Sequence, residues 1–185
     1  LTSKSDFGNA LALGRQGLIE RAEREKKSGK KEGGYNSRRL AELMPEIKKA
    51  AKKYGVPEDL LIAHTITESG FQTGAHNASG ATGILQIMPD TAKGLGLDYN
   101  RLRNDDAYGV DGGAKYLAQI KKETNGSWED ASRAYYMGPG GLNRYKATKG
   151  KSFKPGFDQS TEYAKKVYAN MLNFQKTRGG RYSIL

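Results

Sequence analysis

Glu68 is the residue of this chain whose position most strongly suggests chemistry. It ends the apolar stretch that begins at Leu60, and Gly70 is expected to cap the helix just beyond it. A carboxyl group at the end of an apolar helix is poorly solvated, and the negative end of the helix dipole lies nearby. Both effects favour the protonated form and raise the pKa. A general acid needs that property near neutral pH, although a Glu that merely ends a core helix explains this segment as well.

A second segment of interest follows about ten residues later and is rich in glycine. Gly80 and Gly83 lie three residues apart, which allows tight turns and a close approach of a ligand to the main chain. Gln86 is a neutral amide between apolar neighbours, and it could bind a sugar N-acetyl group if it faces a cleft. Taken alone, this pattern indicates a turn more often than a site.

The third segment places two adjacent tyrosines before a glycine-rich turn. Tyr135 and Tyr136 end an expected helix, and Gly138 to Gly141 follow them with Pro139 between. A tyrosine hydroxyl could orient a catalytic carboxyl group, and the glycine backbone could line a groove. The alternative is an ordinary helix end with aromatic residues in the core.

Together these segments resemble the soluble lytic transglycosylases, a lysozyme-like family that cleaves bacterial peptidoglycan. The matching motifs are Glu68–Phe71, Gly80–Pro89 and Ala134–Gly140, in the order and approximate spacing of the family. The resemblance extends over about residues 40–175 and leaves residues 1–34 outside. It implies a mostly α-helical, α+β lysozyme-like fold, with at most a short β-hairpin near 78–88.

The resemblance also assigns roles to single residues. Glu68 matches the catalytic acid/base, and Tyr135 matches the tyrosine that forms a hydrogen bond with it. The residues expected to bind substrate along the sugar cleft are Ser79, Gln86, Met88, Tyr136 and Tyr163. Two positions depart from the family pattern, because Tyr136 replaces a usual Asn and Gln159 replaces a common Glu. These departures concern subsite contacts and glycan preference rather than the acid.

Glycoside cleavage usually employs two carboxyl groups, but the chain offers one strong candidate. Asp90 and Asp98 fit better as helix-start or loop residues. The family resemblance implies that Glu68 protonates the oxygen between N-acetylmuramic acid and N-acetylglucosamine, with assistance from the 2-acetamido group. The ionised Glu68 then takes the proton of the muramic 6-hydroxyl, which closes a 1,6-anhydro ring without a metal or organic cofactor.

Three alternatives remain open at this point. A hydrolytic lysozyme could use the same Glu with a bound water. A structural or cell-wall-binding protein with a degenerate site, such as a virion component, would suit the departures at Tyr136 and Gln159. Specific nucleic-acid binding is less favoured, because the basic flanks lack interleaved aromatic residues or a known motif.

Other polar residues give weaker signals. His64 lies four residues before Glu68 on the same helical face, where it could tune the carboxyl group or simply pack. His76 does not form a convincing metal pair with it. The acidic residues Asp105, Asp106 and Asp111 lack the spacing of a calcium loop, so no metal site is predicted.

Helical periodicity accounts for most of the elements that must position these residues. The expected helices cover 9–27, 37–54, the segment from Pro57 to Gly70, a short one from Pro89 to Gly94 or Gly96, 106–124, 127–137 and 160–177. A glycine-rich break at 28–34 makes 1–34 a charged extension, and 35–185 the catalytic domain. Residues 146–158 are expected to form an exposed loop.

The bulk composition restricts the setting. The 185 residues contain no cysteine, no apolar run of transmembrane length and no secretory signal pattern at the start, which is Leu1. The net charge of +11 lies on the flanks, and 54–143 carries more Asp and Glu than Lys and Arg. The flanks could therefore attract an anionic wall or membrane surface. We expect a monomer acting on glycan strands in the periplasm or at the cell wall, of bacterial or phage origin, as a mature product or part of a longer chain.

Overall fold

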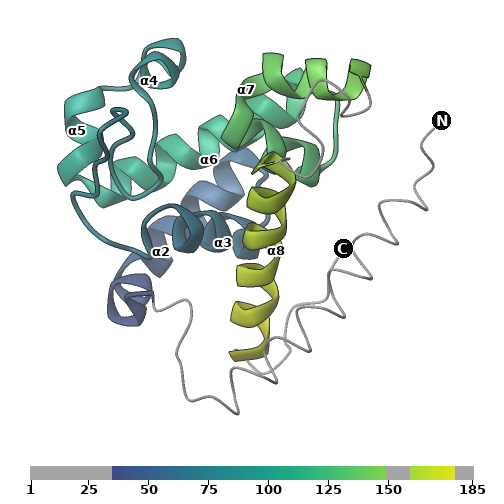
Figure 1. Cartoon of the computed structure of the whole chain (residues 1–185). Coiled ribbons are helices and arrows are strands. Elements are labelled where there is room, and N and C mark those ends of the chain that lie inside the picture. Colours follow the sequence, from purple (N-terminus) through teal and green to yellow (C-terminus); the bar gives the residue numbers. More distant parts are fainter. Residues whose placement is uncertain (1–34, 149–158, 178–185) are drawn as a thin grey trace. The chain divides into compact units, whose positions relative to one another are not determined.

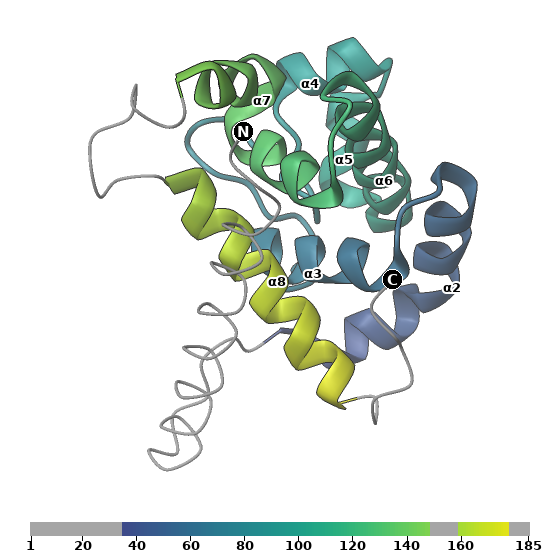
Figure 2. The same cartoon turned by 90° about the vertical axis from the view of Figure 1, so that its right-hand side faces the viewer.

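The helix that carries Glu68 lies in the middle of a helical bundle. In this computed structural model, residues 35–148 and 159–177 are described. Helix α3 (Glu58–Ser69) packs against α2 (Ser37–Tyr54) and is crossed by α8 (Gln159–Thr177), as Figures 1 and 2 show. The described residues contain four further helices, which are α4 (Pro89–Leu95), α5 (Tyr99–Asn104), α6 (Asp106–Glu123) and α7 (Trp128–Thr148).

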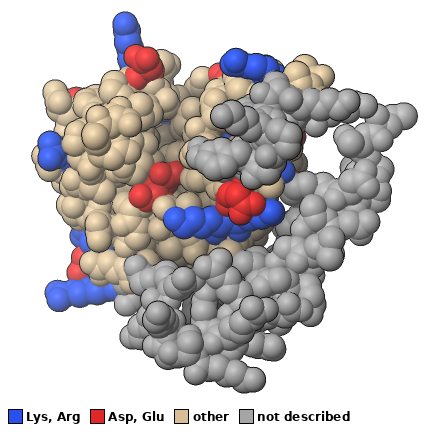
Figure 3. Space-filling view, in the orientation of Figure 1, with Lys and Arg blue, Asp and Glu red and all other residues tan. Residues whose placement is uncertain are grey.

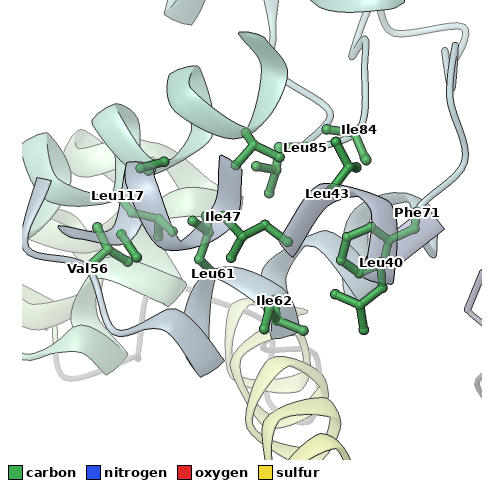
Figure 4. Close-up of a cluster of buried hydrophobic side chains, with 14 of the residues drawn as sticks. Leu40, Leu43, Ile47, Val56, Leu61, Ile62, Phe71, Ile84, Leu85 and Leu117 are labelled. Atoms are coloured by element: carbon green, nitrogen blue, oxygen red, sulfur yellow. The ribbon is translucent and has the colours of Figure 1, made fainter. Parts of the chain in front are cut away.

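Helix α3 is central because it is apolar on nearly all sides. Every residue from Asp59 to Thr65 is buried, so the helix has no solvent face over this stretch. Its neighbours are amphipathic by contrast, and α2 buries Leu43 and Ile47 while its last turn exposes Lys52 and Lys53. The core labelled in Figure 4 joins α2, α3, α6 and the loop before α4, through Leu40, Leu43, Ile47, Val56, Leu61, Ile62, Phe71, Ile84, Leu85 and Leu117.

Glycine residues end the helices where the sequence predicted them. Gly55, Gly70 and Gly96 follow α2, α3 and α4 in the left-handed conformation, with φ of 67°, 60° and 68°. Each donates its N–H back to a carbonyl of the last turn, which satisfies groups that a helix end leaves unpaired. The helices predicted over 37–54, before Gly70, from Pro89, over 106–124 and over 160–177 are confirmed within one or two residues.

Three details differ from the sequence expectation. Helix α5 was not predicted, because six residues are too short to show a periodic pattern. Helix α7 continues to Thr148 through a kink at Gly138 (φ 74°, ψ 158°), instead of ending at 137. In the segment 78–88, β structure is limited to isolated antiparallel bridges that pair Thr82 with His76 and with Ile87.

Some predictions fall on residues that the structure does not describe. The helix at 9–27, the break at 28–34 and most of the loop at 146–158 lie outside the described ranges, so the domain boundary near residue 35 stays a prediction. Among the described helices, none is both long and apolar enough to cross a membrane. On the face in Figure 3, the described Lys and Arg side chains lie in separate groups, with acidic side chains beside some of them.

Candidate active site

Glu68 occupies the last turn of α3, where the central helix reaches the edge of the core. It is partly buried, and Ser69 and the left-handed Gly70 follow it directly. Burial raises the pKa of the Glu68 carboxyl group to about 7, against the opposing effects of a Tyr163 hydrogen bond and the positive charge of Lys166. The raised pKa predicted from the sequence is therefore found, and its main cause is desolvation.

The direct partner of Glu68 comes from α8. The hydroxyl of Tyr163 donates a hydrogen bond to Oε1 of Glu68. The ring of Tyr136, from α7, stacks on Tyr163 with centroids 5.3 Å apart and an interplanar angle of 28°. Tyr136 is 48% exposed, so it presents a solvent-accessible aromatic surface beside Tyr163, the partner of the carboxyl group. The structure thus brings together Glu68, Tyr163 and Tyr136, three of the residues predicted from the sequence.

The expected hydrogen bond from Tyr135 to Glu68 is wrong. The hydroxyl of Tyr135 donates to the carbonyl of Leu85 at 2.7 Å, and its ring packs against His64 at a centroid distance of 4.9 Å. Successive helical residues point about 100° apart, so Tyr135 faces the core while Tyr136 faces solvent. The hydroxyl that reaches Glu68 belongs to Tyr163, because α8 packs along α3 and places its first turns beside the last turn of α3.

The glycine-rich segment forms a tight loop beside the end of α3. Gly83 has a φ of 75°, and a Cβ there would lie 2.2 Å from the carbonyl oxygen of Leu102, so only glycine fits. Gln86 also has a positive φ, 48°, and its Nε2 donates to the carbonyl of Gly83 at 2.9 Å. The amide of Gln86 is thereby fixed in place and half-buried.

Three side chains hold this loop by its main-chain carbonyls. Ser69 donates to the carbonyl of Ile84 at 2.7 Å, Tyr135 to that of Leu85, and Tyr99 to that of Gly80 at 2.5 Å. Ser69 directly follows Glu68, so the loop is tied to the helix turn that carries the acid. Apart from the hydroxyl groups themselves, these tethers have no recognisable signal in the sequence.

The remaining predicted substrate residues are less closely tied to Glu68. Met88 is 40% exposed at the start of α4, close to Gln86 in the chain. Ser79 lies exposed in the turn before Gly80, where its N–H donates to Oδ1 of Asn77 at 2.9 Å. Within the described residues, no hydrogen bond or ring contact joins Ser79 to Glu68.

His64 lies fully buried beneath the site. Its Nδ1 is 3.0 Å from the hydroxyl oxygen of Tyr163, and its Nε2 is 2.9 Å from Oγ of Ser132 on α7. Glu68, Tyr163 and His64 therefore form a continuous chain of hydrogen-bonding groups. The sequence left open whether His64 packs in the core or tunes the carboxyl group. The structure shows that His64 packs in the core and that Tyr163 connects it to Glu68.

The acidic residues around the start of α6 do not converge on a metal site. Asp105 caps α6 by accepting the N–H of Tyr108, whereas Asp111 accepts from Lys53 on α2 at 2.8 Å. Asp106 is buried and binds the guanidinium group of Arg39. No cluster of three His, Cys, Asp or Glu side chains with metal-ligand geometry occurs among the described residues.

Comparison with known proteins identifies the family. The model of the family described as "Transglycosylase SLT domain" matches residues 45–155, which is more than half of the chain and contains Glu68, the glycine-rich loop and Tyr135. The chain belongs to the transglycosylase SLT family. Tyr163 and the rest of α8 follow the matched span.

Curated relatives of this SLT domain are membrane-bound lytic murein transglycosylases. Transglycosylase C of Haemophilus influenzae is 36% identical over 87 residues, which cover 43% of this chain and 24% of the relative. Transglycosylase F of Pseudomonas fluorescens is 30% identical over 148 residues, which cover 70% of this chain and 30% of the relative. The chain thus spans less than a third of the length of these two relatives.

Two solved structures share the fold. The lytic transglycosylase Slt of Pseudomonas aeruginosa, solved as an inactive mutant, aligns with a TM-score of 0.60 and 24% identity over 75% of this chain and 25% of that one. The 70 kDa soluble lytic transglycosylase of Escherichia coli aligns with a TM-score of 0.64 and 21% identity over 73% and 24%. These likenesses establish the helical fold expected from the sequence.

Proposed function

We propose that this SLT domain is a lytic transglycosylase. It cleaves the β-1,4 bond between N-acetylmuramic acid and N-acetylglucosamine in bacterial peptidoglycan and leaves a 1,6-anhydro-muramic end. Glu68 is the single acid/base. The observation that carries the proposal is the position of this carboxyl group, which is desolvated, has a pKa of about 7 and is held by Tyr163, within the SLT-matched region.

The geometry supports both halves of the reaction. With a pKa near 7, Glu68 is substantially protonated at neutral pH and can donate a proton to the leaving glycosidic oxygen. Once ionised, the carboxylate accepts the hydrogen bond of Tyr163, which steadies it for the second step. That step is removal of the proton from the muramic 6-hydroxyl, whose intramolecular attack closes the anhydro ring. This chemistry requires no metal or organic cofactor.

A second carboxyl group also has a raised pKa and must be weighed as a rival acid. Burial raises the pKa of Glu129, on α7, to about 7. Glu129 forms an ion pair with Arg133 at 3.3 Å, one helical turn away, and both side chains are largely buried. Within the described residues, no hydrogen bond or ion pair joins Glu129 to Glu68 or Tyr163, so Glu129 serves as a matched control.

The substrate contacts proposed around Glu68 are Tyr136, Tyr163, Gln86, Met88 and Ser79. Tyr136 is the most exposed aromatic residue at the site, and its stacked position suits contact with the apolar face of a sugar ring. Tyr135 acts by holding the loop that carries Gln86 rather than by touching the acid.

The decisive experiment is mass analysis of the fragments released from purified sacculi. The unmodified chain should release muropeptides with anhydro-muramic ends, and Glu68→Gln should release none while still binding sacculi. Glu129→Gln should retain the activity, because the acid remains in place. Each variant is compared at equal concentration, after circular dichroism has shown that it is folded.

Each alternative predicts a different outcome of this experiment. Reducing muramic ends would assign the site to a hydrolytic lysozyme. Lysis by Glu68→Gln at the parent rate would remove Glu68 from its role, and loss of lysis only in Glu129→Gln would transfer the role to that residue. Binding to sacculi without any cleavage by the unmodified chain would favour a wall-binding component.

The place of action follows from the proposed substrate. A peptidoglycan-cleaving domain works in the periplasm or at the cell wall, and its curated relatives are membrane-bound lytic murein transglycosylases. Attraction of the basic flanks to anionic surfaces, a monomeric state and a phage or virion setting stay predictions. Sedimentation of the purified chain would test the monomeric state.

A further inference from the structure

The buried imidazole of His64 extends the site beyond the groups that face substrate. His64 is fully buried, and both ring nitrogens lie within hydrogen-bond distance of a hydroxyl group. Buried polar groups are rarely left unpaired, so the direction of each hydrogen bond is informative. The direction can be deduced here from the neighbouring groups.

Ser132 determines which nitrogen of His64 carries the hydrogen. The hydroxyl of Ser132 donates to the carbonyl of Trp128 at 3.0 Å, one turn earlier on α7. A hydroxyl has a single hydrogen, so while Ser132 donates it to Trp128, Oγ of Ser132 accepts from Nε2 of His64. The lone pair of the neutral ring then lies on Nδ1, which faces the hydroxyl of Tyr163 at 3.0 Å.

We propose that His64 is a positioning residue that favours the protonated form of Glu68 by accepting a hydrogen bond from Tyr163. The inference rests on the proposed role of Glu68 as acid/base. When Glu68 is protonated, its hydroxyl donates to the oxygen of Tyr163, and Tyr163 turns its own hydrogen to Nδ1 of His64. When Glu68 is ionised, Tyr163 donates to the carboxylate instead, and Nδ1 is left without a donor.

The two states therefore differ by one hydrogen bond in a buried place. The protonated state has the bonds Glu68 to Tyr163 and Tyr163 to His64, whereas the ionised state has only the bond from Tyr163 to Glu68. Leaving the buried Nδ1 unpaired costs free energy, which His64 adds to the cost of ionising Glu68. Burial lowers the pKa of His64 to about 3, so the ring stays neutral throughout the working range.

The other groups around Glu68 do not replace this acceptor. On α8, Lys166 favours the ionised carboxylate through its charge. Tyr135 on α7 and Tyr116 on α6 have pKa values raised by burial, so they stay neutral. Tyr135 donates to Leu85. Among the described residues, no titratable group of α2 perturbs the pKa of Glu68. His64 is thus the acceptor within reach of Tyr163 when Glu68 is protonated.

Titration of the Glu68 carboxyl carbon by NMR measures the effect directly. In His64→Leu, which removes the acceptor, the pKa of Glu68 should fall by about 0.5 to 1 unit, the worth of one hydrogen bond. In His64→Asn, whose side-chain oxygen can accept the same hydrogen, most of the shift should be recovered. In the Tyr163→Phe background the same His64→Leu change should have almost no effect, because the connecting hydroxyl is missing.

Ser132→Ala provides a second variant that keeps the imidazole. Without the Ser132 acceptor, His64 can carry its hydrogen on Nδ1 and donate to Tyr163, which favours ionised Glu68 and lowers its pKa. This variant keeps the test decisive if His64→Leu does not fold. An unchanged Glu68 pKa in folded His64→Leu or Ser132→Ala would overturn the proposal, as would an equal shift with and without the Tyr163 hydroxyl.

The NMR readout is independent of lysis, so the two proposals can fail separately. A shifted pKa in a chain that releases no anhydro product would leave the coupling intact and reject the proposed function. With both proposals correct, the alkaline limit of lytic activity in His64→Leu moves to lower pH by the same amount as the NMR titration. A limit that stays fixed while the NMR pKa moves would overturn the link between His64 and the reaction.

Discussion

At the scale of single residues, the site depends on a carboxyl group whose ionised form is destabilised by burial. Glu68 has lost most of its water, and its one strong partner is a neutral hydroxyl rather than a cation. Asp106 illustrates the contrast, since it is more deeply buried yet binds the guanidinium group of Arg39. A carboxyl group without a directly bonded cation can hold a proton at neutral pH, as acid catalysis requires.

Lytic activity should fall as the pH rises through about 7. The first step needs protonated Glu68, and the pKa of this group is raised to about 7. The initial rate of release from sacculi at low substrate concentration should therefore decline about tenfold per unit at higher pH, which is the slope for loss of one proton. A rate that stays level from pH 6 to pH 9 would contradict the assignment of Glu68 as the acid.

The same pKa predicts a pH-dependent stability. The pKa of Glu68 in the folded chain, about 7, exceeds its ordinary value of 4.5, so the folded state holds the proton more tightly than the unfolded state. The ionised group therefore destabilises the fold as the pH rises from 4.5 to 7, by on the order of 3 kcal/mol once fully developed.

Glu68→Gln removes this cost. Urea unfolding should show the variant to be more stable than the parent at pH 8, and the difference should shrink at pH 4, where both states of the parent are protonated. Glu123→Gln, an exposed carboxyl on α6, is the control and should show no such trend. The opposite result would be a Glu68→Gln variant whose gain in unfolding free energy over the parent is smaller at pH 8 than at pH 4. That result would contradict the predicted cost of ionised Glu68.

The sequence was sufficient to single out Glu68 but not its hydroxyl partner. An apolar run that ends in a carboxyl group and a glycine is a local pattern, and its consequence for solvation is local too. The partner depends on how α7 and α8 cross α3, and both carry a tyrosine at a suitable place. Tyr135 and Tyr163 could be told apart only by the packing of the helices.

At the scale of elements, the glycine-rich loop is positioned by its backbone. Gly83 approaches the carbonyl of Leu102, and the loop carbonyls at Gly80, Ile84 and Leu85 accept from three hydroxyl groups. The sequence predicted a tight turn from the two glycines, but the tethers are contacts between distant segments. Tertiary contacts of this kind leave no periodic trace in a sequence.

Gly83→Ala should be strongly destabilising. The new Cβ would lie 2.2 Å from the main-chain oxygen of Leu102, at a φ of 75° that side chains disfavour. The main chain at Leu102 can move only at a large energetic cost. We therefore expect the free energy of unfolding, measured with urea, to fall by roughly 3 kcal/mol or more. A loss below about 1 kcal/mol would mean that the loop can move away from Leu102.

Gly94→Ala is the matched control for this substitution. Gly94 lies in α4 with nothing within 4 Å of its Cβ position. Because alanine favours the helical conformation, this variant should gain up to about 1 kcal/mol. The two changes are chemically identical, so opposite signs would isolate the effect of the close approach at Gly83.

Helix boundaries show where local reasoning succeeds among these elements. Gly55, Gly70 and Gly96 each end a helix as predicted, because the left-handed cap is a property of the residue itself. Gly138 also has a positive φ, 74°, yet α7 resumes after it. Pro139, which follows, suits the first turn of a new helical segment, so the predicted stop becomes a kink.

At the scale of the whole molecule, α2 is joined to α6 by an ion pair whose carboxylate is buried. Asp106, at the start of α6, accepts from Nε and Nη2 of Arg39 at 2.9 and 2.7 Å, and from Thr73. The side chain of Asp106 has no exposed surface. The pair therefore connects the first described helix to the helix that supports α5 and α7.

Arg39→Met should destabilise the fold by about 3 kcal/mol or more, because it leaves a buried carboxylate without its cation. Arg38→Met is the control. Arg38 is the adjacent residue and pairs with Glu42 on the exposed face of α2, where its side chain is 91% exposed. That change should alter the unfolding free energy by less than about 1 kcal/mol. Equal losses of unfolding free energy in the two variants would show that the Arg39–Asp106 pair stabilises the fold no more than an exposed pair does.

The sequence predicted the fold class of the whole domain, which structural relatives bear out. It could not predict the pairing of α2 with α6, because Arg39 and Asp106 are 67 residues apart and neither has a local signature. The matched region also corresponds to only part of each longer relative. The structure therefore accounts for a catalytic domain, and the activity of a complete protein is a separate proposal.

The tethers of the glycine-rich loop have a consequence for how this domain could change its glycan preference. Ser69, Tyr135 and Tyr99 hold the loop through carbonyl oxygens, which every amino acid possesses. These tethers are therefore insensitive to the exposed side chains of the loop, whereas Gly83 and the buried Ile84 and Leu85 stay constrained by close packing. Exposed positions such as Ser79 and Met88 can be varied without loss of the tethers, so the proposed substrate contacts of the loop can change while its path beside the acid is kept.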